Sequence, residues 1–80
     1  MPVIRQQLGR LVELMVDRCD EVEVAESAEG NRTLFTIKVA TTDLGMVIGK
    51  QGRTIGALRS LVALRGEQRD ERYELEVAED

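Results

Sequence analysis

The segment VIGKQGR, residues 47–53, is the most informative stretch of this chain. In it two glycines bracket a lysine and a glutamine, and the residues on both sides have helical periodicity. Gly49 and Gly52 lack a Cβ, so the backbone there can adopt unusual dihedral angles and come into close contact with a ligand. Lys50 and Arg53 stand beside that opening. A helix that starts after the turn would point its first amides toward an anion. The segment therefore predicts a turn that grips phosphate.

Helices are predicted on both sides of this turn from apolar residues that recur at intervals of three and four. They are expected at residues 3–18, 44–48 and 53–65. Thr42 or Asp43 is placed to cap the second helix through its side chain, and Gly66 is placed to end the third in a left-handed conformation. The inner face of the third helix is expected to carry Ile55, Leu58, Leu61 and Val62.

Strands are predicted where apolar and polar residues alternate. They are expected at residues 21–26, 33–40 and 72–77, with residues 28–32 as the turn between the first two. The middle strand is the clearest, because Phe35, Ile37 and Val39 share one face. Each strand has only one consistently apolar face, which is typical of a sheet covered by helices on one side.

The stretch DLGMVIGKQGRTIGALRSLV, residues 43–62, resembles the KH domain, whose GXXG loop holds the backbone of a single-stranded nucleic acid. Its sequence is most similar to that of the small bacterial single-KH RNA-binding proteins of the KhpA type. With the order helix, strand, strand, helix, helix, strand, the resemblance implies an α+β fold of KH type II. In that fold a three-stranded mixed sheet carries its helices on one face. The chain is expected to form a single KH domain over residues 1–80.

The resemblance also implies which residues contact RNA. The GKQG loop, residues 49–52, would hold phosphate and sugar, and apolar residues of the flanking helices would line the groove or join the core. Of these apolar residues, Ile55 is the one favoured to be exposed in the groove, because it lies one turn past the loop at the start of the inner face. Arg59 and Arg65 are expected to be solvated charges. The RNA-binding residues implied are Gly49, Lys50, Gln51, Gly52, Arg53, Val47, Ile48 and Ile55.

Two departures from the family pattern bear on recognition. Met46 stands where these small KH proteins often carry a lysine, which removes a charge from the rim of the groove. The chain also has one tyrosine and one phenylalanine, neither within the motif. Recognition by aromatic stacking is therefore not expected, and we predict a loose sequence preference and a modest affinity.

Charge is distributed unevenly along the chain, although its net value is -4. Residues 44–66 contain four bases and no acid, whereas residues 17–30 and 67–80 each have a net charge of -5. A chain polarised in this way can present a local positive surface while the remainder stays acidic. The acidic segments are interpreted as solvated strand faces.

Other functional classes find little support in the sequence. The stretch GMVIGKQ, residues 45–51, has three residues between its glycines and lacks the hydroxyl that a Walker A loop places after its lysine. The chain has no histidine, and its one cysteine, Cys19, is expected to be a packed residue at the end of the first helix. No enzyme activity, metal or cofactor is expected. No apolar run is long enough for a membrane span or a signal peptide, which predicts a cytoplasmic protein.

The function implied is non-catalytic binding of single-stranded RNA, as an RNA chaperone or post-transcriptional regulator linked to cell elongation and division. The resemblance further implies a homodimer, or a heterodimer with a KH protein of the Jag (KhpB) type. The alternative is a KH-fold interaction module that acts mainly through such pairing. Neither a membrane nor a small-molecule substrate is expected as a partner.

Overall fold

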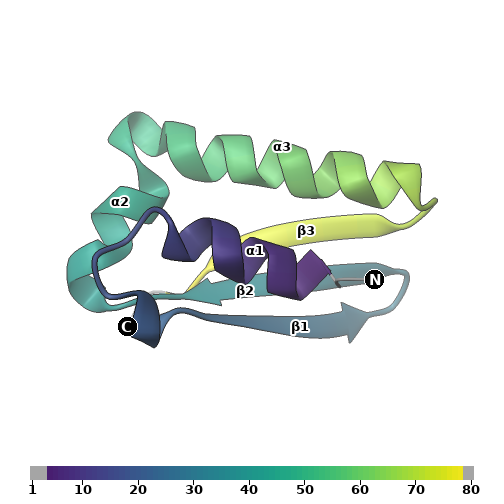
Figure 1. Ribbon diagram of the computed structural model, residues 1–80. Coiled ribbons are helices and arrows are strands. Elements are labelled where there is room, and N and C mark those ends of the chain that lie inside the picture. The colour runs from purple at the N-terminus through teal and green to yellow at the C-terminus, as the bar shows by residue number, and fades with distance from the viewer. Residues whose placement is uncertain (1–3, 79–80) are drawn as a thin grey trace.

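The computed structural model describes residues 4–78, and in it the helices cover one face of a three-stranded sheet (Figure 1). The helices are α1 (Ile4–Glu13), α2 (Leu44–Ile48) and α3 (Arg53–Gln68). The strands are β1 (Glu23–Glu29), β2 (Arg32–Lys38) and β3 (Arg72–Val77). Short 3-10 turns lie at η1 (Cys19–Glu21), η2 (Thr41–Asp43) and η3 (Lys50–Gly52). This order confirms the α+β architecture of a type II KH domain.

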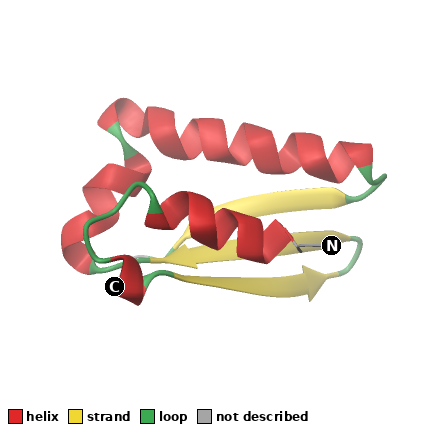
Figure 2. Ribbon diagram, viewed as in Figure 1, coloured by secondary structure: helices red, strands yellow, loops and turns green. Residues whose placement is uncertain are grey.

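The sheet is mixed, with β2 in its centre (Figure 2). β1 pairs with β2 in the antiparallel direction, whereas β3 pairs with β2 in the parallel direction. Parallel neighbours need a crossover connection, and here α2, the turn η3 and α3 provide it. The register places Ile37 opposite Val24 and Phe35 opposite Leu75, which aligns the apolar face of all three strands under the helices.

One hydrophobic core fills the space between the sheet and the helices. Phe35 and Ile37, as the alternation predicts, are 2% and 0% exposed, and Phe35 packs edge-on against Tyr73 with ring centroids 5.4 Å apart. The core side chains are Leu8, Val12, Phe35, Ile37, Val39, Val47, Ile55, Leu58, Val62, Tyr73 and Leu75. Three of them, Ile55, Leu58 and Val62, belong to the predicted inner face of α3, which is thus anchored over the sheet.

Several predicted boundaries are wrong at the ends of elements. α1 ends at Glu13 and not at residue 18, because the chain tightens there: the Met15 amide donates to the Val12 carbonyl, three residues back, at 2.9 Å. Residue 3 lies outside the described residues. β1 begins two residues later than predicted and ends at Glu29, so that the turn before β2 shrinks to residues 30–31. β2 covers 32–38 in place of 33–40.

The end of α3 also differs from the prediction. The helix continues through Gly66 to Gln68, and Asp70, with φ 57°, is the residue in the left-handed region. Gly66 is buried because β3 returns directly beneath it. A Cβ at this position would lie 2.8 Å from the Glu71 carbonyl oxygen and 3.0 Å from the Tyr73 ring. Gly66 therefore permits close packing and does not end the helix.

Two side chains expected in the core lie outside it. Leu61 is 53% exposed, because it lies on the side of α3 that faces away from the sheet, toward the space beside α1. Cys19 is exposed in the turn η1, since α1 ends before reaching it. Of the helices in residues 4–78, none has both the length and the apolar character needed to cross a bilayer.

Candidate nucleic-acid interface

The GKQG segment, residues 49–52, forms a sharp turn between α2 and α3 at one end of the molecule (Figure 1). α2 covers Leu44–Ile48, as predicted, and its last turn leads directly into the loop: the Gly49 amide donates to the Gly45 carbonyl at 2.9 Å. The Gly52 amide then donates to the Gly49 carbonyl at 3.1 Å. The loop is thus held by its own backbone and by the two helices that flank it.

The backbone of this loop explains its glycines. Gly49 has φ 76° and ψ 171°, a region that is essentially restricted to glycine. Gly52 has φ 73° and ψ 16°, in the left-handed region. Gln51 lies between them with φ 58° and ψ 26°, which is uncommon for a residue with a side chain. Three of the four loop residues therefore have a conformation that ordinary side chains disfavour, and glycine adopts it without strain at two of them. Gln51 alone is strained, and strained residues are common at functional sites.

The two glycines differ in what surrounds them. A Cβ on Gly49 would lie 2.2 Å from Thr54 Oγ1 and 2.9 Å from the Thr54 backbone nitrogen, so this glycine packs against the start of α3. A Cβ on Gly52 would meet no atom within 4 Å. Gly49 closes the loop from the inside, whereas Gly52 leaves its outer surface open to a ligand.

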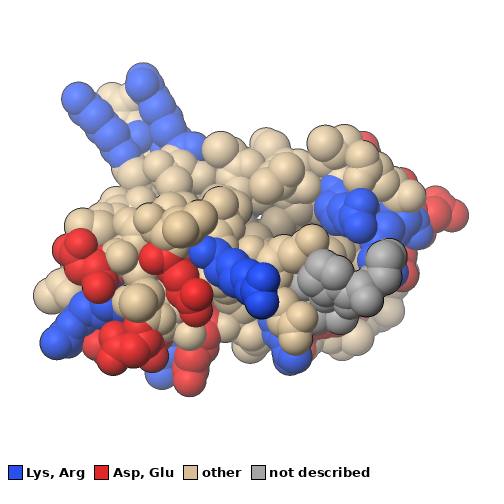
Figure 3. Space-filling view, in the orientation of Figure 1, with Lys and Arg blue, Asp and Glu red and all other residues tan. Residues whose placement is uncertain are grey.

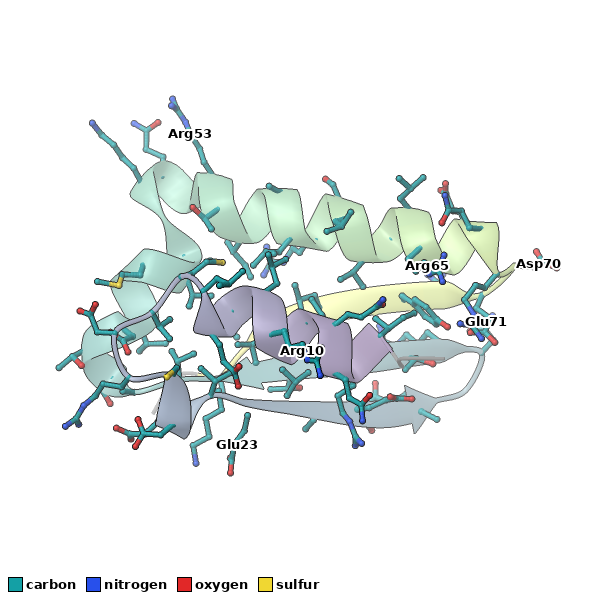
Figure 4. The ribbon with its side chains drawn as sticks, in the orientation of Figure 1. Arg10, Glu23, Arg53, Arg65, Asp70 and Glu71 are labelled. Carbon is teal, nitrogen blue, oxygen red and sulfur yellow. The ribbon has the colours of Figure 1, made fainter. Side chains whose placement is uncertain are left out.

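The side chains of the loop point into solvent. Lys50, Gln51 and Arg53 are exposed, and the Arg53 guanidinium donates to Gln51 Oε1 at 3.2 Å. Arg53 extends away from the body of the fold (Figure 4). In Figure 3 basic side chains project from this end of the molecule, and acidic side chains gather lower down on the same side of the view. Because residues 44–66 contain no acid, the exposed side chains of Lys50, Gln51 and Arg53 give this end of the molecule a basic, hydrogen-bonding surface.

Arg53 occupies an electrostatically unfavourable position. It is the first residue of α3, a helix with no acid in its first turn. The N-terminus of a helix carries a partial positive charge, so a base there costs about 0.3–1 kcal/mol relative to the reverse charge. Lys50 adds a second base on the same side. An anion placed at this end of α3 would relieve the unfavourable interaction.

The apolar residues next to the loop divide between the core and the surface. Val47 is 0% exposed and Ile55 is 7% exposed, so the expectation that Ile55 is exposed is wrong. Both side chains are enclosed by the core cluster, which leaves neither free to contact RNA directly. Ile48 is partly buried against the same cluster. Met46 is 45% exposed beside the loop. It was not among the predicted site residues, because the sequence analysis considered only the lysine that it replaces.

Arg59 is tied to the sheet and is not simply a solvated charge. Its Nε donates to the Leu75 carbonyl at 3.2 Å, which links the middle of α3 to β3. Periodicity could not reveal this contact, because it depends on which strand lies under the helix. Within residues 4–78, no three acidic, cysteine or histidine side chains are grouped so as to hold a metal ion.

The fold and the loop together define a KH domain of type II, and comparison with known proteins narrows the assignment. A family model described as "KhpA/KhpB, KH domain" matches residues 5–77. The chain belongs to this KhpA/KhpB family of KH domains.

Curated relatives agree with this assignment. "RNA-binding protein KhpA" of Chlamydia pneumoniae is 32% identical over 77 residues, covering 96% of this chain and 99% of the relative. The protein of the same name from Clostridium acetobutylicum is 34% identical over 74 residues, covering 92% and 99%. That from Halalkalibacterium halodurans is 40% identical over 63 residues, covering 79% and 83%. No solved structure gives a significant match.

Proposed function

We propose that this chain is a single KH domain that binds single-stranded RNA without catalysing a reaction, and that the loop Gly49–Gly52 with Arg53 holds the sugar-phosphate backbone. The observation that carries the proposal is the loop itself. Its outer surface is open at Gly52, and its exposed side chains include Lys50 and Arg53. The names of the relatives, which describe RNA-binding proteins, support the same conclusion.

Binding in this site follows from elementary electrostatics. A phosphate placed against Gly52 can approach the backbone closely, because no side chain intervenes. Lys50 and Arg53 neutralise its charge, and the N-terminus of α3 adds a favourable dipole. Apolar contacts to the bases are supplied by Met46 and by the exposed part of Ile48. These contacts lack directional hydrogen bonds, so the domain discriminates weakly between bases.

The biological role that this binding serves is that of an RNA chaperone or post-transcriptional regulator in the cytoplasm, linked to cell elongation and division. A non-catalytic role is supported by the composition of the site. The loop and its flanks provide hydrogen-bond donors and positive charge, and residues 44–66 contain no acid, histidine or cysteine that would serve as a general base or nucleophile.

The loop is tested by the double variant Lys50→Asp with Gln51→Asp, which places two carboxylates against phosphate. Arg5→Asp with Gln6→Asp is the matched control, because it changes the charge equally at two exposed positions in the first turn of α1. Binding of a fluorescein-labelled pool of random-sequence RNA octamers should weaken by at least tenfold, about 1.4 kcal/mol, only in the loop variant. Equal affinities of the loop variant and the control would contradict the assignment of the loop.

Salt dependence provides a second measurement on the wild-type protein. If Lys50, Arg53 and one further base neutralise about three phosphates, log K against log salt should have a slope of about -2. A slope steeper than about -5 would indicate a much larger basic surface. A wild-type protein that does not bind the RNA pool would favour the alternative, a KH-fold module that acts through protein pairing.

We also infer that the chain pairs with a second KH chain, either a copy of itself or a protein of the Jag (KhpB) type. An apolar groove of about 360 Å³ lies between α1 and α3, lined by Ile4 and Leu11 on one side and by Leu61 and Leu64 on the other. Leu61 and Leu64 are 53% and 51% exposed. Large exposed apolar side chains that adjoin one another mark interaction surfaces.

Sedimentation equilibrium at micromolar concentration tests this pairing. Leu61→Asp places a charge in the groove and should convert a dimer to a monomer. Leu14→Asp is the matched control, because Leu14 is 85% exposed and does not line the groove. A Leu61→Asp protein that keeps the mass of a wild-type dimer would contradict the role of the groove.

A further inference from the structure

Asp43 is the one charged residue that is buried among residues 4–78, with 1% of its surface exposed. A buried carboxylate is costly unless hydrogen bonds compensate for its lost hydration. Its Oδ2 accepts a hydrogen bond from the backbone N–H of Arg18 at 3.0 Å, across 25 residues of sequence. The contact joins the connection between α1 and β1 to the beginning of α2.

This contact replaces the local one that the sequence predicts. Asp43 occupies the N-cap position of α2, where an aspartate ordinarily accepts a hydrogen bond from the first amides of its own helix. Here the side chain makes no capping bond. The carboxylate is directed instead to a distant part of the chain, so its role is tertiary.

α2 depends on such tertiary contacts for its orientation. The helix has five residues, of which Val47 alone is buried, and helices this short are unstable in isolation. Asp43 and Val47 are four residues apart and therefore lie on the same side of the helix. Beyond Val47 the chain passes directly into the loop, through the bond from the Gly49 amide to the Gly45 carbonyl. A change in the tilt of α2 would therefore move the loop.

We propose that Asp43 is a positioning residue of the RNA site: by accepting the Arg18 amide it fixes α2 and places the loop, residues 49–52, against the N-terminus of α3. The proposal rests on the function proposed for the loop. The Arg18 side chain takes no part, since it is 63% exposed and pairs with Glu21 at 3.1 Å. The positioning therefore needs the carboxylate and a backbone N–H, whatever side chain residue 18 carries.

Three variants separate this role from general stability, with the random-sequence RNA octamers as the probe and circular dichroism at low temperature as the check of folding. Asp43→Ala should weaken binding by about threefold or more, and its salt slope should stay that of the wild type because no base is lost. Asp43→Asn retains an acceptor oxygen and should bind within about twofold of the wild type. Arg18→Ala retains the amide and should do the same.

The hydrogen bond can also be removed without changing a side chain, which covers the case in which Asp43→Ala does not fold. Because Cys19 follows Arg18, a synthetic peptide of residues 1–18 can be ligated to residues 19–80. An ester in place of the amide at residue 18 deletes the N–H and changes no side chain, and it should again weaken RNA binding by about threefold or more, about 0.65 kcal/mol.

The outcomes distinguish this proposal from the function on which it rests. If the variant Lys50→Asp with Gln51→Asp binds RNA as the wild type does, the loop assignment fails. If that variant loses binding while the folded ester protein stays within about twofold of the wild type, Asp43 has no positioning role. Loss of binding by Asp43→Asn as large as that of Asp43→Ala would also overturn the proposal, because the amide oxygen can accept the same bond.

Discussion

Alanine at each of the two loop glycines should have very different effects on stability. Gly49→Ala places a methyl group 2.2 Å from Thr54 Oγ1, 2.7 Å from Thr54 Cβ and 2.9 Å from the Thr54 backbone nitrogen. The hydroxyl can rotate away, but the backbone nitrogen belongs to the first turn of α3 and cannot move alone. Gly52→Ala meets no atom within 4 Å, so its cost is conformational only.

The magnitudes follow from these two environments. At Gly49 the backbone region costs about 1–3 kcal/mol for a residue with a side chain, and the overlap with Thr54 adds about 1–3 kcal/mol. At Gly52 the left-handed conformation costs about 1–2 kcal/mol. Both variants regain about 0.4–1 kcal/mol because alanine stiffens the unfolded chain. The free energy of unfolding should fall by about 3 kcal/mol for Gly49→Ala and by about 1 kcal/mol or less for Gly52→Ala.

Urea denaturation followed by circular dichroism measures both values. With a slope of about 1 kcal/mol per molar urea, Gly49→Ala should lower the midpoint by about 3 M and Gly52→Ala by less than about 1 M. Gly52→Ala should nevertheless weaken RNA binding, because its new methyl group stands on the open surface of the loop, where phosphate is proposed to bind. Equal midpoints for the two variants, or a larger loss for Gly52→Ala, would refute the environments assigned to these glycines.

Four further variants test α3 and β3. Gly66→Ala should destabilise the fold by about 1–2 kcal/mol despite a better helix propensity, whereas Gly56→Ala, with no atom within 4 Å of its new Cβ, should stabilise it by about 0.5–1 kcal/mol in urea melts. Arg53→Glu should raise the free energy of unfolding by about 0.5 kcal/mol, because an acid in the first turn of α3 interacts favourably with the helix dipole. The same variant should weaken RNA binding. A lower stability would contradict the role of the dipole. The pKa of Tyr73 is raised above its ordinary value of 10.0, first by the hydrogen bond that its hydroxyl donates to Glu71 and then by burial. Because the folded state holds this proton more tightly, stability should fall as the pH rises above about 10, and Tyr73→Phe should flatten that fall in thermal melts.

Most of the architecture could be predicted because alternation and helical spacing reflect burial on one face. The predicted range of β3, the range of α2 and the buried residues Phe35, Ile37 and Val39 are all confirmed. The ends of elements were predicted less well. Gly66 has the sequence signature of a helix end, yet it lies inside α3 because β3 passes beneath it. A glycine that ends a helix and a glycine that permits close packing look the same in the sequence. Only the position of the neighbouring strand shows which role Gly66 has.

The chemistry of the loop is determined by the sequence alone. Two glycines, a lysine and an arginine without a nearby acid specify a basic turn that can approach phosphate, whatever surrounds it. The tertiary structure decides which side chains that turn can use. Val47 is buried and Met46 is exposed, although they are consecutive residues of one short helix.

The tertiary structure also decides the partner of Asp43. Its position before α2 predicts a helix cap, whereas in the fold its side chain accepts a hydrogen bond from the Arg18 amide. The spacing of residues defines the faces of a helix, but the rotation of each helix against its neighbours is set by packing between segments that are distant in sequence. That rotation depends on contacts that no local pattern contains.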